Sequence, residues 1–492
     1  MENLRLKIFS FQFSIFNLFF FLSFAFLSVN AIFIYNEIYW FNLLPLALVV
    51  IAFAFLSLEK LLLFIVFFTP LSVNLEQLEF GLGMALPTEP LMFGAMLIFF
   101  LRTFYEKDFD IKILKHPITI AIIVNLVWVA LTVFTSKLQV VSFKHFVAKM
   151  WFVVCFYFIA TQIFREQKNI LRFFWLYIIP LALVVIYTMF QHAQHNFEEK
   201  PAHWVMQPFF KDHTSYGAIL AMFFPFIIGS FFSKKINGLK KVFSILLFSI
   251  ITIGLVFSYT RAAWISIIIA LGIFFIYFFR IRFHTIAIGF TLLLTLFLFF
   301  QNDIFNSLEK NKQESSSDFA QHAQSVTNIA SDASNLERLN RWNCALRMFA
   351  ENPVFGTGPG TYQFLYSPYQ HSSELTIIST KFGDAGNAHS EYLGPLAESG
   401  IFGALTFLAL IICMYVSASK LYFRLKEREL KIIVLTTILG FSTYVIHGIL
   451  NNFLDTDKAS VPFWGFIAVI VAVEIYHQKQ EYPDKNLSVK QP

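Results

Sequence analysis

Apolar runs of membrane length follow one another along almost the whole of this 492-residue chain. A helix needs about 20 mainly apolar residues to cross a bilayer. Such runs lie near residues 8–29, 40–57, 60–72, 90–104, 117–135, 145–164, 169–191, 214–233, 240–258, 262–279, 283–300, 391–419, 431–451 and 461–477. The run at 60–72 is short, and no stretch shows the two-residue alternation of a membrane β-barrel. We therefore predict an all-α polytopic membrane protein with about 12–14 transmembrane helices.

The charged residues predict the orientation of the chain. Only 14% of the residues are charged, 57% are hydrophobic, and the net charge is +6. Cytoplasmic loops collect lysine and arginine, and the basic segments 234–241, 280–282 and 420–431 all lie on the cytoplasmic side when both termini are cytoplasmic. This charge then faces anionic lipid headgroups, so membrane lipids are expected partners and nucleic acid is not.

One long polar segment, residues 301–388, interrupts the apolar runs on the opposite side of the membrane. It divides the chain into five predicted regions. These are an N-terminal transmembrane bundle (1–200), central transmembrane helices (201–300), a large outer loop with short helices (301–389), C-terminal transmembrane helices (390–477) and a cytoplasmic tail (478–492). Arginines in this loop and at the membrane surface, with few metal-binding patterns around them, suggest an anionic, lipid-linked substrate.

Arg261 stands in the tight turn Tyr259-Thr-Arg261-Ala-Ala-Trp264 between two apolar runs, at the outer boundary of the membrane. The distribution of basic residues does not favour a cation there, so Arg261 needs an anionic partner or ligand. A snorkelling side chain or a structural ion pair is the alternative interpretation.

A second pair of arginines lies on an amphipathic helix predicted over 335–349. Leu339, Trp342, Leu346 and Phe349 form one apolar stripe, and Arg338 and Arg341 flank it on the same side. Guanidinium groups offer paired donors to phosphate oxygens, so these arginines could hold a diphosphate. Alternatively the helix is interfacial and its arginines touch lipid headgroups. The glycines at 356–360 that follow predict either a plain turn or a phosphate-facing nest of backbone amides.

His389 precedes the next long apolar helix, and Asn387 and Ser390 are candidate caps. The positive end of that helix should lower the pKa of the imidazole and keep it neutral, as a general base requires. A structural, hydrogen-bonded histidine is the alternative. Glu391 and Glu398 lie seven residues apart on the same helix and are expected to orient neighbouring groups.

Further polar groups fall on the same predicted side of the membrane, which suggests a common site: Glu89, Lys144, Asp212, His213 and Asp455 to Lys458. The histidines between 192 and 213 do not have the spacing of a zinc site. The Asp455-Thr-Asp457 pair could hold a divalent cation, but the adjacent Lys458 favours an internal ion pair. We therefore predict no metal and no cofactor.

These motifs resemble those of the O-antigen ligase and O-antigen polymerase superfamily (WaaL and Wzy type). The similarity rests on the turn around Arg261, on Glu337-Arg338 to Trp342 with Asn352 to Gly358, and on His389 to Leu393 with Glu398 to Gly403. It implies a GT-C-like fold and a role in lipopolysaccharide biosynthesis. It also implies metal-independent, inverting transfer from undecaprenyl diphosphate at the periplasmic face of the bacterial inner membrane. Two arginines near the diphosphate and a loop histidine carry over to Arg261, Arg338 and His389, and Arg341 competes with Arg338.

The expected function is O-antigen ligase-like transfer of a glycan to a hydroxyl of lipid A-core. A polymerase acting on a second lipid-linked repeat and a protein O-oligosaccharyltransferase are the alternatives within the same chemistry. A lipid-linked glycan transporter is the alternative from a different class. The predicted catalytic residues are His389, Arg261 and Arg338. The predicted contacts with the donor diphosphate or the acceptor are Arg341, Lys144, His213, Asp212, Glu391 and Tyr259.

Overall fold

The structure, a computed structural model, is predominantly helical. It describes residues 2–36, 57–74, 84–105, 109–234, 236–282, 333–375 and 386–478, and between these the residues 41–42, 45, 284–285, 288–289, 291–292, 295, 299–300 and 379. Two compact units are formed, Met1–Leu61 and Leu62–Pro492. In the first unit, helix α1 (Glu2–Tyr35) contains the predicted run 8–29. Near its end the Asn30 amide donates to Asn42 Oδ1 at 2.7 Å.

The long helices occur where the apolar runs predict them. Nine described helical segments are long and apolar enough to cross a membrane: Pro117–Phe134, Gln139–Ile163, Gln167–Ala193, His213–Ser230, Leu239–Val256, Arg261–Phe278, Leu393–Arg424, Arg428–His447 and Asp457–His477. In chain order these segments are α6, α7, α9, α11, α12, α13, α18, α19 and α20. Helix α7 (Gln139–Val153) is continued by the π-helix η4 (Val154–Ile159) and by α8 (Ala160–Ile163). Helix α20 (Asp457–Ala472) is continued by the π-helix η7 (Val473–His477). The prediction of an all-α polytopic membrane protein is confirmed.

Shorter elements complete the second unit. They are α3 (Leu58–Phe68), η2 (Thr69–Leu71), α4 (Thr88–Tyr105), α5 (Ile111–Leu114) and α10 (Glu199–Ala202), with the strands β1 (Val73–Asn74) and β2 (Ala85–Leu86). The strands pair antiparallel, Val73 opposite Leu86. The predicted runs at 60–72 and 90–104 correspond to α3 and α4, which are not among the nine, and those at 40–57 and 283–300 fall largely outside the described residues. The total of 12–14 spans therefore stays a prediction, as do the five regions.

Helix α20 lies at the centre of the bundle, where every residue from Asp457 to Val473 is buried. Around it, α11 packs on α19, α13 on α19, and α6 on α18. Close approach of α11 and α19 depends on a glycine, because a Cβ on Gly440 would lie 2.3 Å from the Met222 carbonyl oxygen. This packing brings the beginnings of α11, α13 and α18 to the same end of the bundle.

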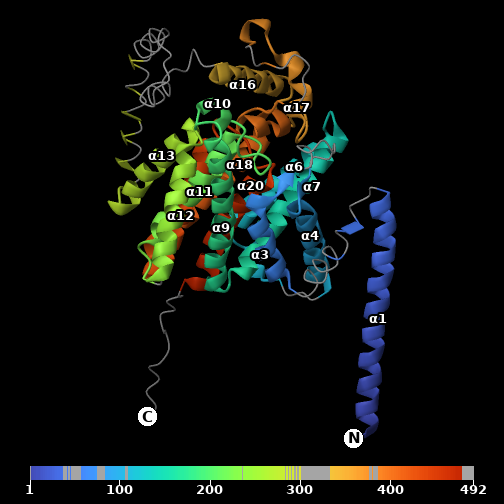
Figure 1. The fold of residues 1–492 in the computed structure, drawn as a ribbon. Helices are drawn as coiled ribbons and strands as arrows, with labels where there is room; N and C mark the ends of the chain where they lie inside the picture. The colour runs from blue at the N-terminus through green and yellow to red at the C-terminus, as the bar shows by residue number, and fades with distance from the viewer. Residues whose placement is uncertain are drawn as a thin grey trace, which may run out of the picture. The chain divides into compact units, whose positions relative to one another are not determined.

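The described part of the outer loop forms short helices at that end (Figure 1). They are α16 (Ala333–Glu351), α17 (Tyr362–Leu365), η5 (Ser367–Tyr369) and η6 (Ser372–Glu374). The predicted helix over 335–349 is confirmed, but its apolar stripe is not the packed face. Leu339 and Leu346 are 40% and 46% exposed, whereas the inward face consists of Asn340, Arg341, Cys344, Ala345 and Met348.

Candidate active site

The beginnings of α11 and α13 lie against each other. The Thr260 hydroxyl, at the N-cap of α13, donates to the His213 carbonyl oxygen at 2.7 Å. A Cβ on Gly217 would lie 2.7 Å from Thr260 Cβ, so only glycine permits this approach. Tyr259 has φ of +49°, which turns the chain just before Arg261, the first residue of α13. Asp212 caps α11 by accepting from the Ser215 backbone amide at 2.8 Å. Two positive helix ends therefore meet beside Arg261.

His389 is held between α16 and α18. The Trp342 indole donates to the His389 carbonyl oxygen at 3.3 Å, and the His389 amide donates to Asn387 Oδ1 at 3.1 Å. Ser390 Oγ accepts from the amides of Tyr392 and Leu393 at 3.3 and 3.4 Å. Of the two predicted caps, Ser390 thus binds amides at the beginning of α18, whereas Asn387 forms only a local turn at His389. His389 itself adopts a left-handed conformation with φ of +47°.

Electrostatic interactions show which groups lie near one another. The positive charge of Arg338 acts on the imidazoles of His389, His213 and His447, and that of Arg261 acts on His213. The carboxylate of Asp212 acts on the same three histidines with the opposite sign. The structure thus brings five sequence-predicted residues into one cluster, which we call the arginine–histidine cluster: Arg261, Arg338, His389, His213 and Asp212.

Burial of His389 lowers the pKa of its imidazole to about 4, and the charges of Arg338 and Arg341 act in the same direction. The expected neutral imidazole is thus supported, but the principal cause is burial and not the helix end, which begins only at Leu393. For Asp212, burial opposes ionisation, but hydrogen bonds from Thr214 and Ser215 outweigh it and lower the pKa of the carboxyl. The cluster therefore pairs a neutral base with an ionised carboxylate.

Arg341 has a different environment from Arg338, although both lie on α16. Its Nε donates to Glu337 Oε1 at 2.6 Å, and its guanidinium lies 3.9 Å from the centre of the Tyr366 ring. It is only 4% exposed, and a Cβ on Gly386 would lie 1.7 Å from its terminal nitrogen. The ion pair with Glu337 and the contact with the Tyr366 ring hold Arg341 within the packed side of α16, which indicates a structural role for this residue. Arg338 stays the predicted second diphosphate ligand.

The glycine-rich turn is structural, and its interpretation as a phosphate-binding nest is wrong. The amides of Thr357 and Gly358 donate to the carbonyls of Ala397 and Glu398 at 3.0 and 2.8 Å. The Glu398 carboxylate accepts from the Gly360 and Tyr362 amides, both at 2.9 Å. Because α18 takes these donors, none of these four amides faces a ligand.

The Glu391 carboxylate is likewise hydrogen-bonded within the protein. Its Oε1 accepts from the Tyr444 hydroxyl at 2.6 Å and from the amides of Phe453 and Leu454 at 2.7 and 2.9 Å. Burial raises the pKa of this carboxyl to about 7. The expected orienting role is observed, and the predicted substrate contact stays a prediction.

The two remaining predicted contact residues are Tyr259 and Lys144. The Tyr259 hydroxyl donates to the Phe197 carbonyl oxygen at 3.0 Å, and Lys144 is exposed on α7. Sequence reasoning instead missed His203, whose ring stacks on His213 at 4.2 Å between centroids, and His447, which is 1% exposed.

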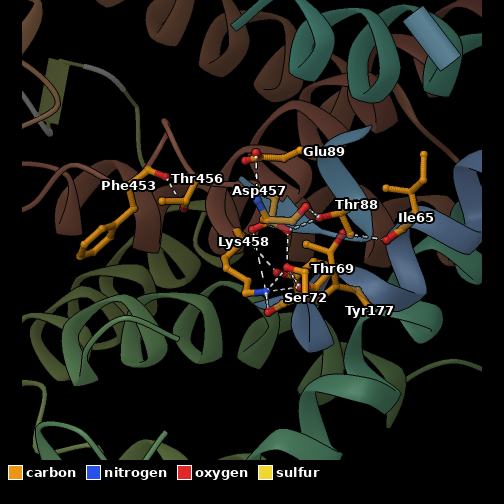
Figure 2. A network of polar contacts seen from close by, with 11 residues as sticks. Ile65, Thr69, Ser72, Thr88, Glu89, Tyr177, Phe453, Thr456, Asp457 and Lys458 are labelled. Atoms are coloured by element: carbon orange, nitrogen blue, oxygen red, sulfur yellow. Dashed lines mark hydrogen bonds and ion pairs between the residues drawn. The ribbon is translucent and has the colours of Figure 1, made fainter. Parts of the chain in front are cut away.

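A separate polar network surrounds the beginning of α20 (Figure 2). Asp457 Oδ2 accepts from Ser72 and Thr88 at 2.5 and 2.7 Å. The Lys458 ammonium donates to the carbonyls of Thr69 and Ser72 at 2.5 and 2.8 Å, and lies 3.9 Å from Asp457 Oδ1. The internal ion pair favoured by the sequence is confirmed. The described residues contain no group of three or more side chains arranged to hold a metal ion.

Comparison with known proteins agrees with this geometry. Residues 243–408 match the family model described as O-antigen ligase. No curated protein matches this chain. The matched stretch contains Arg261, Arg338 and His389, three members of the arginine–histidine cluster, and it ends within α18. Residues 243–408 therefore match the O-antigen ligase family, which supports a relationship of this part of the chain to the O-antigen ligase and polymerase superfamily.

Proposed function

We propose that the protein moves a glycan from undecaprenyl diphosphate to a hydroxyl of lipid A-core, at the periplasmic face of the bacterial inner membrane. The observation that carries the proposal is a half-buried histidine with a pKa well below neutrality, in the arginine–histidine cluster at the end of a membrane bundle. That combination suits a reaction in which a hydroxyl loses a proton while a diphosphate leaves.

His389 is the proposed general base. A pKa of about 4 leaves its imidazole free to accept the proton of the acceptor hydroxyl at neutral pH. The hydroxyl oxygen then forms a bond to the anomeric carbon of the donor sugar from the face opposite the diphosphate. The bond from that carbon to the phosphate oxygen breaks, and the configuration inverts. Asp212, whose carboxylate acts on His389, would stabilise the imidazolium that results.

Arg261 and Arg338 are the proposed ligands of the departing diphosphate. Negative charge grows on the phosphate oxygens as the glycosidic bond breaks, so donors at that position stabilise the transition state more than the ground state. Each such donor contributes about 3 kcal/mol by analogy with oxyanion-hole donors. The diphosphate itself supplies the driving force, so neither a nucleotide nor a metal ion enters the proposed reaction.

The acceptor distinguishes a ligase from a polymerase. The family match over residues 243–408 supports the donor chemistry that the two share, and lipid A-core is the acceptor that we propose. A polymerase would use the same donor groups and lengthen a second lipid-linked glycan instead.

The test is transfer by purified protein given undecaprenyl-diphosphate glycan with lipid A-core or with no second acceptor. Transfer to lipid A-core is expected from the wild type. Arg261→Ala should lower the transfer rate about 10²- to 10³-fold. Arg282→Ala should leave it unchanged, because Arg282 is exposed beyond the other end of α13. A chelator such as EDTA should leave the rate unchanged.

Other results would refute the ligase proposal in specific ways. Elongation of the lipid-linked glycan without lipid A-core would indicate a polymerase. Activity that EDTA stops and Mg²⁺ or Mn²⁺ restores would direct attention to Asp455 and Asp457. No transfer, with passage of a labelled lipid-linked glycan across proteoliposomes, would indicate a transporter.

A further inference from the structure

Three consecutive apolar side chains of the outer loop are exposed directly after α16. They belong to residues 353–355, which we call the Pro-Val-Phe segment. Val354 is 44% exposed and Phe355 is 43% exposed. The segment belongs to the polar stretch 301–388, which hydropathy places outside the membrane. Adjacent apolar side chains that a protein leaves uncovered mark a contact with another molecule or with lipid.

Contacts with α6 show where the Pro-Val-Phe segment lies along that candidate membrane span. The Phe355 ring stacks on the Trp128 indole, with 5.6 Å between centroids and 8° between planes. Trp128 precedes Phe134, the last residue of α6, by six residues, which corresponds to about 9 Å along the helix axis. The Lys137 amide, just beyond α6, donates to the Thr357 carbonyl oxygen at 3.0 Å. The chain therefore runs alongside the last turns of α6 before it reaches the end of that helix.

The Pro-Val-Phe segment is also hydrogen-bonded to α18. The Ile401 amide donates to the Pro353 carbonyl oxygen at 2.9 Å, and Ile401 belongs to the candidate span Leu393–Arg424. Gly400 permits this contact, because it has φ of +67° and a Cβ there would lie 2.0 Å from the Val354 carbonyl oxygen. The segment is thus held against two membrane helices that pack on each other.

The exposed side chains of the segment continue the exposed apolar surface of both helices. Leu131 and Phe134 of α6 are exposed, and so is Phe402 of α18. The Trp128 indole joins these groups, because it contacts the Phe402 ring at 4.9 Å between centroids as well as the Phe355 ring. Exposed apolar side chains on a membrane-spanning helix face the hydrocarbon of the bilayer. The segment therefore extends a surface that lipid covers.

Polar residues mark where this apolar surface ends. Thr135, Lys137 and Gln139 are exposed in the connection from α6 and at the beginning of α7. A lysine at the end of a membrane helix places its ammonium among the lipid headgroups. Because the Lys137 amide is bonded to Thr357, headgroup level falls near Thr357, and Phe355 lies on the hydrocarbon side of it.

We propose that the Pro-Val-Phe segment is inserted into the bilayer, and that the acyl chains of the leaflet on the outer-loop side are its partner. The segment follows α16 directly, so its insertion holds that helix, and with it Arg338, against the membrane surface. This inference concerns the contact between the outer loop and the membrane and does not depend on glycan transfer.

Spin labels test the proposal in the full-length protein, in bilayers of phosphatidylethanolamine and phosphatidylglycerol. Labels are attached through Val354→Cys and Phe355→Cys, and the former keeps the stack of Phe355 on Trp128. A label in hydrocarbon is relaxed by dissolved oxygen, whereas a label in water is relaxed by a soluble nickel chelate. Leu131→Cys on α6 is the membrane control, and Leu375→Cys, at an exposed leucine that follows η6, is the control in the outer loop. The wild type, treated with the same label, gives the background from the half-buried Cys413.

Labels at both positions should show the oxygen-to-nickel accessibility ratio of Leu131→Cys, roughly tenfold above that of Leu375→Cys, because a polar chelate is excluded from hydrocarbon. A ratio equal to that of Leu375→Cys would place the segment in water and overturn the proposal. Access to neither reagent would show that protein covers the segment, for example a second copy of the chain, and would also overturn it.

These bilayers contain no polyprenyl lipid, so oxygen access cannot arise from a bound polyprenyl tail. Adding undecaprenyl phosphate should leave the ratio unchanged at both positions. A fall in oxygen access confined to Val354→Cys and Phe355→Cys would assign the surface to that tail instead of the bilayer. None of these measurements requires transfer, so a wild-type protein that transfers no glycan would refute the proposed function and leave this result valid.

Discussion

Two groups of charges in this molecule differ in how they are balanced. At the beginning of α20, Asp457 and Lys458 lie close together, and hydroxyl and carbonyl groups of Ser72, Thr69 and Thr88 complete their hydrogen bonding. In the arginine–histidine cluster, cations accumulate around histidines that burial keeps neutral. Asp212 and Glu337 oppose these charges at His389. The first arrangement satisfies its charges internally and serves the fold, whereas the second is suited to an anion from outside.

The largest effect on the transfer rate should come from removing His389, the proposed base in the arginine–histidine cluster. His389→Asn should lower the transfer rate by about 10²- to 10⁴-fold, the usual contribution of a general base. Asparagine tolerates the left-handed backbone at this position, so thermal stability should change little. Transfer kinetics and a melting curve on the same preparation measure both. A variant that keeps the wild-type rate would remove His389 from the chemistry.

Three arginines of α16 allow a proposed diphosphate ligand, Arg338, to be compared with two arginines that form ion pairs within the protein, Arg341 and Arg347. Arg338→Ala should lower the rate about 10²- to 10³-fold at nearly unchanged stability. Arg341→Ala should instead cost about 3 kcal/mol of stability, because it leaves Glu337 buried without its partner. Arg347→Ala breaks a partly exposed pair with Glu374 and should cost at most about 1 kcal/mol.

Thermal denaturation and transfer rates, measured on all three variants, give the readout. If Arg341→Ala were stable and inactive while Arg338→Ala kept its activity, the two residues would exchange roles.

Substitutions in the network of Asp457 and Lys458 should change the stability of the fold more than the transfer rate. Lys458→Met should lower the free energy of unfolding by about 3 kcal/mol, because Asp457 would be left buried without its cation. The double variant Asp457→Asn with Lys458→Met should recover part of that loss, since no buried charge remains uncompensated. The rate per folded molecule should fall less than tenfold. A loss of activity larger than this at wild-type stability would contradict a purely structural role for the pair.

The smallest expected effect is an absence of pH dependence. Because burial lowers the pKa of His389 to about 4, kcat/KM should show no protonation of this group between pH 5.5 and 8. The unfolded imidazole titrates near 6.5, so the stability contributed by neutral His389 is present above pH 6.5 and is lost as the pH falls towards 4. Relative to His389→Asn, the wild type should therefore lose stability in that interval. A decrease in kcat/KM centred near pH 6.5 that disappears in His389→Asn would show that the imidazole is not buried.

The membrane helices could be predicted from the sequence because length and hydropathy decide them locally. The nine candidate spans coincide with apolar runs, and Ser390 binds amides at the beginning of α18 as its residue type suggests. The Asp457–Lys458 pair was also visible, because the two residues are adjacent in the chain.

Which residues α16 turns inward could not be predicted from its own sequence. Its packed face includes Asn340 and Arg341, whereas Leu339 and Leu346 lie on the exposed side. A spacing of three residues between Arg338 and Arg341 does not decide which of them is buried, since Tyr366 and Gly386 determine it from elsewhere in the chain.

The glycine turn after α16 also has a consequence for how this domain can evolve. Gly356, Gly358 and Gly360 all have positive φ, and a Cβ on Gly358 would lie 2.0 Å from Ser136 Oγ, so the turn fits only one place on the bundle. Arg338 is therefore positioned by contacts made after it in the chain. A side chain at any of these glycines would displace the turn and, with it, the helix that carries Arg338, so substitutions here should be rare among functional relatives.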